Sequence, residues 1–390
     1  MTSALLNELE ATQRLAIALF EGVDRADRCR QFHPDLSPLA WHLGHVAFIE
    51  TYWVREVALG DDSVTRPLHD LYFPERYPKR LRSYALSDAD DVVAFATGLF
   101  DGNRRRIGEM LGGASRHPIL NNDYLVLFLI QHHAQHVETM RMALHQRAMQ
   151  HPAPPGFRAP GRLRPRDPGA EWLAFGAGET YIGYEKNDAV PFDNELARHR
   201  VSMAPYRLAA SPVSNAEYLA FMGAGGYSDA RLWDADAWRW LTALGAGTPV
   251  HWRRDADGEW YQIGLDGPQA LDADAPVQGI SRHEARAFCA WAGGRLPHER
   301  EWEHAARAST RLERSTGRAW EWCANPFYPY PGFRAFPYDR YSTPWFDGTH
   351  FTLRGGSVHS LPAVKRPSFR NFYTAETRHI FAGVRMATDG

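Results

Sequence analysis

Cysteine is scarce in this sequence, with only three in 390 residues. Cys29, Cys289 and Cys323 form no CxxC pair, and they provide no disulfide framework of the kind found in small secreted domains. This usage is typical of a reducing cytoplasm, so we expect a cytoplasmic protein.

Long apolar runs and net charge are also lacking. The longest strongly apolar run, YLVLFLI at 124–130, is far shorter than the roughly 20 residues of a membrane span, and the first residues contain no apolar core of a secretion signal. Lys and Arg number 44 against 46 Asp and Glu, which leaves a net charge of -2. Because this balance provides no attraction for polyanions, we expect neither a nucleic acid nor a membrane as partner.

Four segments near the start of the chain have apolar side chains at helical spacing. They cover residues 3–23, 37–59, 87–111 and 121–149. Ser37 is the predicted N-cap of the second helix, with Pro38 at its first position. Ser87 and Asp88 predict the start of the third helix. Four helices with one long connection, residues 59–86, predict an up-down bundle.

The chain changes character after residue 150. Residues 151–169 are dense in Pro, Gly and Arg, which is typical of an irregular linker. Beyond residue 170 the segments are short, with one clear helix at 281–293 and another around 298–308. A chain of this length is expected to form two domains. We therefore assign residues 1–150 to the helical bundle and 170–390 to an irregular α+β domain.

Two histidines occur one helical turn apart in an apolar segment. His132 and His136 share one face of the fourth helix, and this face continues through Leu125 and Leu129. Both imidazoles are therefore expected to project into the bundle interior. A buried imidazole pair without partners is costly, and a divalent metal would supply a partner for both. The alternative, of equal weight from spacing alone, is a pair of core-edge histidines bonded to backbone or water.

A third ligand is available on the second helix. This helix carries His42 and His45, and Gly44 leaves room for another element to approach closely. Three neutral imidazoles from two helices form a facial set with open positions, which suits Fe(II), Zn(II) or Ni(II). Spacing does not choose between His42 and His45. Glu138 lies two residues after His136 and cannot share its helical face, so we expect it to pair outside the ligand set.

The segments LSPLAWHLGHVAFIE and HHAQHVE resemble the DinB-type bundle of the iron-dependent sulfoxide synthases of ergothioneine biosynthesis, the EgtB type. The resemblance implies a non-heme Fe(II) oxidoreductase whose metal ligands are His45, His132 and His136. It also implies that Gln135 lies near the substrate and a bound water.

The second half resembles the formylglycine-generating-enzyme-like (sulfatase-modifying-factor) domain of the same family, which has an irregular C-type-lectin-like fold. The segments that carry this resemblance are SPVSNAEYLAFMGAGGY, GISRHEARAFCAWAGGRLPHEREWEHAARA, LRGGSVHS and FRNFYTAETRHIFAGVRMA. The expected fold class is therefore α plus α+β, a DinB-like four-helix bundle followed by this domain. Formylglycine-generating enzymes carry a cysteine pair after the R-G-G-S segment, and this sequence has none there. We therefore expect Cys289 and Cys323 to be core residues and the domain to line a pocket.

The acceptor substrate of this family is hercynine, whose trimethylammonium group has no N–H to donate. Recognition must therefore use aromatic faces, shape and polar contact with the carboxylate. The resemblance implies Asn371 as the carboxylate contact and Phe372 as the aromatic face, with simple packing as the alternative for Phe372. It also implies Tyr338 and Tyr341, in FPYDRYS, as candidates for substrate contact and proton delivery.

The family joins a sulfur or selenium donor to C2 of the hercynine imidazole, with O2 as oxidant. Tyr373 and Phe372 stand where members that use γ-glutamylcysteine carry Asp and Trp, and WHLGH replaces the WHLAH common in cysteine-using members. These departures resemble selenoneine synthases, so we expect a selenosugar donor stacked on Tyr373. Arg82, on the 59–86 connection, is a further candidate for donor contact. The alternative is an ergothioneine-pathway enzyme that uses cysteine or γ-glutamylcysteine.

Two other classes of function stay open. DinB bundles with three histidines also occur in metal-dependent thiol transferases, which need no O2, but those usually lack a second domain of this size. A non-catalytic binding module would combine an inactive bundle with a ligand-binding second domain, and the intact His45, His132 and His136 speak against it.

Overall fold

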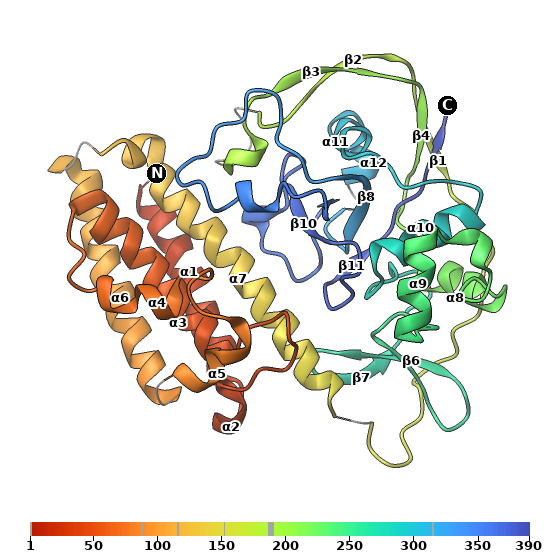
Figure 1. Ribbon diagram of the computed structural model, residues 1–390, viewed down its shortest axis with the longest axis horizontal. Coiled ribbons are helices and arrows are strands. Elements are labelled where there is room, and N and C mark those ends of the chain that lie inside the picture. Colours follow the sequence, from red (N-terminus) through yellow and green to blue (C-terminus); the bar gives the residue numbers. More distant parts are fainter. Residues whose placement is uncertain (1, 87–88, 115–116, 152, 186–190, 314–315) are drawn as a thin grey trace. The chain divides into compact units, whose positions relative to one another are not determined.

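The computed structural model describes residues 2–86, 89–114, 117–151, 153–185, 191–313 and 316–390. The contacts within the chain divide it into two units (Figure 1). The first unit comprises Met1–Gln150 together with Ser360–Val364, and the second comprises His151–His359 and Lys365–Gly390. The first unit is therefore not continuous in sequence. The predicted cap at Ser87 and Asp88 lies outside the described residues.

Four long helices form the first unit, as the helical spacing predicted. They are α1 (Thr2–Glu21), α3 (Leu39–Thr51), α6 (Ala89–Glu109) and α7 (Tyr124–Met149). A π-helical turn, Tyr52–Val57, extends α3. Helix α1 packs on α7, and α3 packs on both α6 and α7. Among the described residues, no helix combines the length and apolar character that a membrane crossing requires.

Short elements fill the connections of the first unit. They are α2 (Arg25–Arg28), Arg66–Leu68, α4 (His69–Tyr72), Lys79–Leu81, α5 (Arg82–Ala85), Met110–Ala114 and Pro118–Asp123. The connection between α3 and α6 therefore contains two helical turns, α4 and α5. Together with η9 (Pro362–Val364), which packs on α7, they complete the unit.

Helix α3 is the core helix of the bundle, because all of its residues are buried. A helix that is buried all round must satisfy its polar side chains inside the protein. Four of them are His42, His45, Glu50 and Thr51. The partners of the two histidines define the candidate site described below.

The predicted cap of α3 is wrong by one residue. The N-cap residue is Pro38, and no side chain caps the helix. The hydroxyl of Ser37 instead accepts a hydrogen bond of 2.6 Å from Nη1 of Arg82. The Ser37 hydroxyl, which the local sequence assigned to the helix start, is thus bound to a guanidinium from the α3–α6 connection.

The second unit contains small sheets joined by irregular segments. Its largest sheet has the strand order β10 (Asn371–Thr374), β9 (His350–Arg354), β8 (Trp320–Pro326), β11 (Ala382–Gly383), with only the β8–β11 pair parallel. The other strands are β1 (Trp172–Phe175), β4 (Tyr206–Ala209) and β12 (Ala387–Asp389) in one sheet, β2 (Gly178–Ile182) with β3 (His199–Met203), and β5 (Trp252–Arg254), β6 (Trp260–Gly264) and β7 (Gly267–Ala270).

Helices of the second unit follow their capping signals. They are α8 (Asn215–Gly223), α9 (Ala235–Leu244), α10 (Arg282–Trp291), α11 (Glu299–Ala308) and α12 (Thr310–Glu313). Helices α10 and α11 confirm the two predicted ones. Helix α8 begins with a capping box of Ser214 and Glu217, and this S-x-x-E signal could have predicted it.

Buried ion pairs, rather than apolar contacts alone, hold the second unit together. Glu299, at the start of α11, accepts hydrogen bonds from both Arg354 and Arg370. Similar pairs are Arg366–Glu195 and Arg385–Glu321, which are buried, and Arg378–Glu284, whose arginine is partly exposed. Arg354 and Arg370 belong to the LRGGS and FRNF segments, so these motifs build the fold of this unit.

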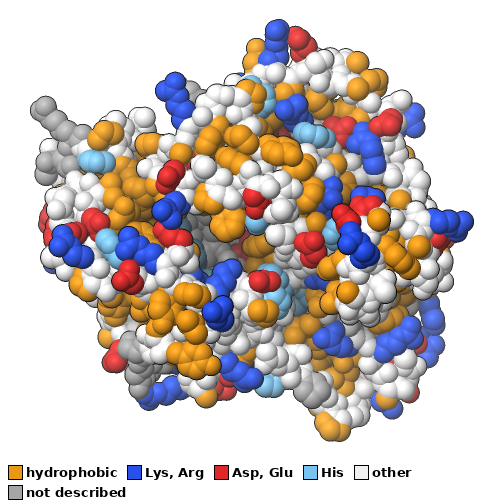
Figure 2. Space-filling model, in the orientation of Figure 1, with side chains coloured by type: hydrophobic (Ala, Val, Ile, Leu, Met, Phe, Trp, Pro, Cys, Tyr) orange, Lys and Arg blue, Asp and Glu red, His pale blue; other side chains and the backbone are white. Residues whose placement is uncertain are grey.

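Residues of the predicted linker are irregular but fixed to the second unit. Arg158, Arg162 and Arg166 each form an ion pair, with partners Asp257, Glu259 and Asp274 at 2.6, 3.1 and 2.7 Å. Acidic and basic side chains are also intermixed on the face of the molecule that Figure 2 presents.

Candidate metal centre

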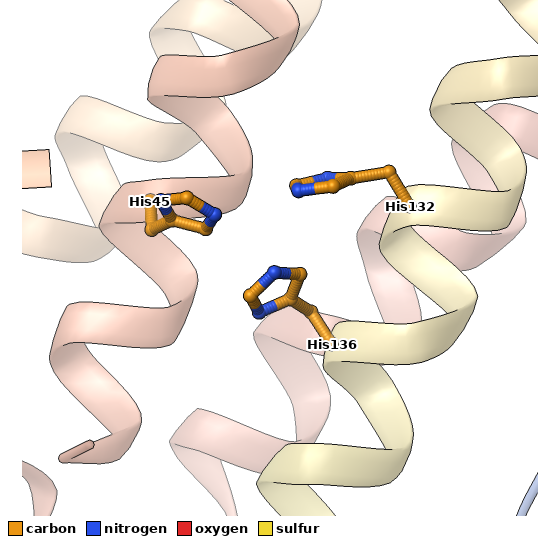
Figure 3. A group of neighbouring side chains, drawn as sticks. All are labelled: His45, His132 and His136. Atoms are coloured by element: carbon orange, nitrogen blue, oxygen red, sulfur yellow. The ribbon is translucent and has the colours of Figure 1, made fainter. Parts of the chain in front are cut away.

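Three histidines from two helices converge in the first unit. His45 projects from α3, and His132 and His136 project from α7, with their rings turned toward one another (Figure 3). One ring nitrogen of each residue lies within 4.8 Å of the others. The ring centroids are 5.3 Å apart for His45–His132, 4.6 Å for His45–His136 and 4.5 Å for His132–His136. Within the described ranges of the chain, the cluster is made of histidines alone.

The helical stripe that predicted the α7 pair is present. Leu129 and Leu125 are fully buried, one and two turns before His132. His132 is 6% exposed, and His136 is partly exposed. The apolar stripe therefore places both imidazoles at the inner face of α7.

Burial keeps all three imidazoles neutral. It lowers the pKa of His45 to about 3, and it lowers the pKa of His132 and of His136 well below the ordinary value. Neighbouring imidazoles lower the pKa of His132 and His136 further. Neutral imidazole is the form that donates a lone pair to a metal.

Hydrogen bonds orient two of the three rings. Nδ1–H of His45 donates to the carbonyl oxygen of Tyr72 at 2.7 Å, which leaves Nε2 as its lone-pair nitrogen. Nδ1 of His136 lies 3.0 Å from Nδ1 of His42. Spacing left the choice between His42 and His45 open. His45 is in the cluster, and His42 contacts His136 from behind.

The donor set fits a divalent transition metal. Three neutral imidazoles without a carboxylate suit Fe(II), Zn(II) or Ni(II). Nδ1 of His132 is buried and has no hydrogen-bond partner among the described residues. Such a group is costly when it is unsatisfied. The alternative of histidines bonded only to backbone or water accounts for the Tyr72 contact but not for the convergence of the three rings.

A second polar cluster lies beside the triad, at residues that helical spacing did not single out. His133 points away from the triad, and its Nε2 lies 3.0 Å from a carboxylate oxygen of Glu50, with both side chains fully buried. Gln13 and Asn103 donate hydrogen bonds to this carboxylate, at 2.7 and 3.1 Å. The sequence signal for this cluster was Glu50, an acidic residue in the largely apolar segment that forms α3.

Glu138 and Gln135, the two other α7 residues considered in the sequence, lie outside the triad. Glu138 is buried and accepts a hydrogen bond of 2.7 Å from the hydroxyl of Ser360. This agrees with its expected pairing outside the ligand set. Gln135 is partly exposed and directly precedes His136.

Arg82 occupies an interior position in the first unit. Its side chain is 2% exposed, and the guanidinium donates to Ser37 and to the carbonyl oxygens of Pro74 and Tyr77. Its N–H groups are thus used within the protein, which favours a positioning role over contact with a donor substrate.

Strand β10 carries three of the expected substrate contacts. Side chains alternate along a strand, so Asn371 and Tyr373 share one face and Phe372 takes the other. The Phe372 ring stacks on Phe327 with centroids 4.3 Å apart. This contact supports the packing alternative for Phe372. The Oδ1 of Asn371 accepts from the Phe372 backbone N–H, which leaves its amide N–H groups as donors.

Tyr338 and Tyr341 lie on one loop of the second unit, with ring centroids 6.5 Å apart. The ring of Tyr341 stacks on Phe192 at 4.1 Å. Asp193, the next residue, accepts hydrogen bonds from the hydroxyl of Ser342 and from the backbone N–H of Phe336 at 3.4 Å. The segment at 192–193 therefore holds the loop at both sides of the two tyrosines.

The two cysteines of the second unit are core residues, as expected. Cys289 and Cys323 are fully buried, and burial raises the pKa of both thiols. Neither thiol is therefore in the form that reacts or binds metal.

Comparison with known proteins places both units. Residues 8–140 match the DinB superfamily, and residues 162–316 and 311–390 match the sulfatase-modifying factor enzyme 1-like domain. The hercynine oxygenase of Mycolicibacterium smegmatis is 31% identical in an alignment 441 positions long, which covers 99% of this chain and 98% of that protein. The hercynine oxygenase of Mycobacterium tuberculosis is 31% identical over 94% of both chains.

A formylglycine-generating enzyme matches only part of the chain. The enzyme of Thermomonospora curvata is 32% identical over 37% of this chain and 52% of its own length. The full-length similarity is thus to proteins that combine the two domains. The chain belongs to the EgtB-type family of hercynine oxygenases, with an N-terminal DinB-type helical domain and a C-terminal sulfatase-modifying-factor-like domain.

Proposed function

We propose that the protein is a non-heme Fe(II) oxidoreductase that joins a chalcogen atom to C2 of the hercynine imidazole. The observation that carries the proposal is the convergence of three neutral histidines in a chain that is similar over nearly its full length to hercynine oxygenases. Joining C2–H to the Se–H or S–H of a donor releases two protons and two electrons. O2 is the acceptor of these electrons.

His45, His132 and His136 would hold the iron. The metal, when bound, supplies redox activation of O2 and a common site for both reactants. The protein keeps the three imidazoles neutral by burial and orients His45 through the Tyr72 carbonyl. Because the three ligands carry no charge, the net charge of the site would be that of the iron and the bound substrates.

Hercynine recognition is assigned to the second unit. We propose that the amide of Asn371 binds the substrate carboxylate and that aromatic faces, with Tyr373 among them, surround the trimethylammonium group. Phe372 would support this strand by packing on Phe327. Gln135, beside the triad on α7, is assigned to the substrate or to a bound water.

Tyr338 and Tyr341 are the proposed proton donors. The O–H of a tyrosine can deliver a proton as oxygen is reduced. The stack of Tyr341 on Phe192 gives this ring a defined orientation, which general acid catalysis requires. Tyr341→Phe removes the hydroxyl and keeps the ring, so it tests proton delivery separately from ring packing. Tyr338→Phe is the matched variant on the same loop.

The proposed donor is a selenosugar, and the protein is then a selenoneine synthase. Support comes from Tyr373, which offers a ring for a sugar to stack on at a position where an amino-acid donor would favour a carboxylate. Gly44, in place of the alanine of cysteine-using members, also supports the assignment. The second candidate is an ergothioneine-pathway enzyme that takes cysteine or γ-glutamylcysteine, which the similarity to hercynine oxygenases favours.

One experiment distinguishes these functions. The purified protein is loaded with Fe(II) and incubated with hercynine, O2 and one donor at a time, and products are identified by mass spectrometry. We expect a C–Se product with a selenosugar. Product with cysteine or γ-glutamylcysteine alone would assign the second candidate. Product formation without O2 consumption would indicate the thiol transferase class.

The matched control is His132→Ala, loaded and assayed in the same way. It should consume no O2 with hercynine and either donor. Hercynine binding by this variant, with no turnover by the native protein, would instead indicate a binding module. We place the reaction in the cytoplasm, consistent with buried, unoxidised Cys289 and Cys323.

A further inference from the structure

Three side chains of the first unit form a stack that ends at His45. The guanidinium carbon of Arg82 lies 3.7 Å from the ring centroid of Trp41. The Trp41 ring in turn stacks on the imidazole of His45, with centroids 4.6 Å apart and planes inclined by 13°. The cation, the indole and the candidate metal ligand are therefore consecutive layers.

Two consecutive carbonyl groups fix the two rings of this stack. Nε1–H of Trp41 donates to the carbonyl oxygen of Leu71 at 2.9 Å, and Nδ1–H of His45 donates to that of Tyr72 at 2.7 Å. Leu71 and Tyr72 end helix α4, in the connection between α3 and α6. One short turn thus sets the rotation of both rings about their side-chain bonds.

Arg82 is fixed at the outer end of the stack. It donates to Ser37 Oγ at 2.6 Å, to the Pro74 carbonyl at 2.8 Å and to the Tyr77 carbonyl at 3.1 and 3.2 Å. These partners are neutral, and burial lowers the pKa of Arg82 to about 10. No carboxylate of the described part of the chain pairs with Arg82, and a cation without such a partner is costly in an interior site. Its planar shape, which fits the indole face, offers the reason for its presence.

We propose that Arg82 and Trp41 are positioning residues that hold the His45 imidazole in its ligating orientation and so set the metal affinity of the triad. This inference rests on the proposed metal site and deepens it. In this role Arg82 acts through Trp41. Neighbouring groups that orient metal ligands typically change metal affinity by about 10- to 100-fold when they are removed.

This positioning role predicts that lysine cannot replace arginine at position 82. Lysine keeps the charge but has no planar group to cover the indole and fewer fixed donors for the three acceptors. Arg82→Lys should therefore loosen Trp41 and, through it, His45. Trp41→Phe keeps an aromatic ring beside His45 but removes the N–H that bonds Leu71, together with part of the stacked area.

The second unit offers a matched control. Arg282 lies 3.7 Å from the ring centroid of Phe351, donates to the carbonyl oxygens of Cys323 and Ala324, and has a pKa that burial also lowers to about 10. Arg282→Lys therefore disturbs a stacked, partly buried guanidinium outside the unit that holds the triad.

The test is anaerobic titration of the full-length apoprotein with Co(II), followed by the visible d–d absorption of the bound ion. We expect Arg82→Lys and Trp41→Phe to weaken Co(II) affinity about tenfold or more. Arg282→Lys should stay within about twofold of the native protein. If Arg82→Lys does not fold, as judged by its far-UV circular dichroism, Trp41→Phe decides the result.

A double-mutant cycle tests whether Arg82 changes the metal affinity through His45. In a His45→Ala background, the further change Arg82→Lys should leave the residual Co(II) affinity unchanged. Native affinity in folded Arg82→Lys and Trp41→Phe, or an undiminished loss in the His45→Ala background, would overturn the inference. A native protein that binds Co(II) but never turns over hercynine would remove the proposed function and leave this inference intact.

Discussion

Nδ1 of His42 lies 3.0 Å from Nδ1 of His136 in the interior of the first unit. One nitrogen of such a pair donates and the other accepts. If His136 presents Nε2 to a metal, its Nδ1 carries the proton and His42 is the acceptor. His42 would then orient His136 as the Tyr72 carbonyl orients His45.

This arrangement predicts different effects for the two histidines of α3. His45→Ala removes a ligand and should abolish tight iron binding, whereas His42→Phe should weaken it only about tenfold, because it removes the orienting acceptor. Equilibrium dialysis against Fe(II) without O2, followed by metal analysis, measures both. The reverse order of effects would make His42 the ligand. His251→Phe, at a buried histidine of the second unit, is the control.

Gly44→Ala should destabilise the first unit and weaken metal binding. An added Cβ would overlap the Tyr72 ring, and displacement of Tyr72 would move the carbonyl that His45 donates to. We expect a loss of about 1–3 kcal/mol in the free energy of unfolding, as for an overpacked core. Urea denaturation of the apoprotein measures it.

Gly98→Ala is the control for this change. Gly98 lies within α6, and nothing would contact an added Cβ there. Alanine should stabilise that exposed helical position by about 0.5–1 kcal/mol. Equal effects at the two glycines would contradict the close approach of Tyr72 as the cause.

His132→Leu should stabilise the apoprotein while it removes metal binding. The buried Nδ1 of His132 has no partner among the described residues, and an unsatisfied buried polar group costs about 1–3 kcal/mol. An apolar side chain of similar size removes this cost. Thermal unfolding of both apoproteins, together with a Co(II) titration, tests the prediction. A less stable His132→Leu apoprotein would show that His132 is satisfied without metal.

Asp193 should make the second unit less stable as the pH rises from about 4 to 6. Burial raises the pKa of Asp193 to about 6, with the neighbouring Glu195 adding to the effect. The folded state therefore binds this proton more tightly than the unfolded state does. Its contribution to stability is complete below pH of about 4 and is lost by pH of about 6, by roughly 3 kcal/mol in total.

Urea denaturation across this pH range measures the effect. Asp193→Asn cannot ionise, so its free energy of unfolding should change less with pH than that of the native protein. Asp236→Asn, at a side chain 80% exposed, should follow the native curve. If Asp193→Asn follows it as well, the carboxyl of Asp193 is not the group responsible.

Periodicity made the bundle and the histidine pair predictable. The i, i+4 spacing of His132 and His136 depends only on the local helix, and the apolar stripe through Leu129 shows which way they face. Contacts between elements were beyond such reasoning. The Ser37 cap failed because Arg82, distant in sequence, claims its hydroxyl. Spacing likewise could not separate His42 from His45, since both lie on a helix that is buried all round.

The second unit was less predictable for a similar reason. Its core uses charged pairs such as Glu299 with Arg354, which no hydropathy pattern reveals. The role of Phe372 depends on which face of β10 it occupies, and its packing on Phe327, which supports the packing alternative, is a contact between separate segments.

The first unit borrows Ser360–Val364 from far along the chain, and the Ser360 hydroxyl bonds to Glu138 on α7. A truncated gene for residues 1–150 would therefore encode a bundle that lacks one of its own pieces. Supplying the missing pentapeptide through a designed tether, rather than trimming at the Pro-rich segment, is the rational route to an isolated helical fragment.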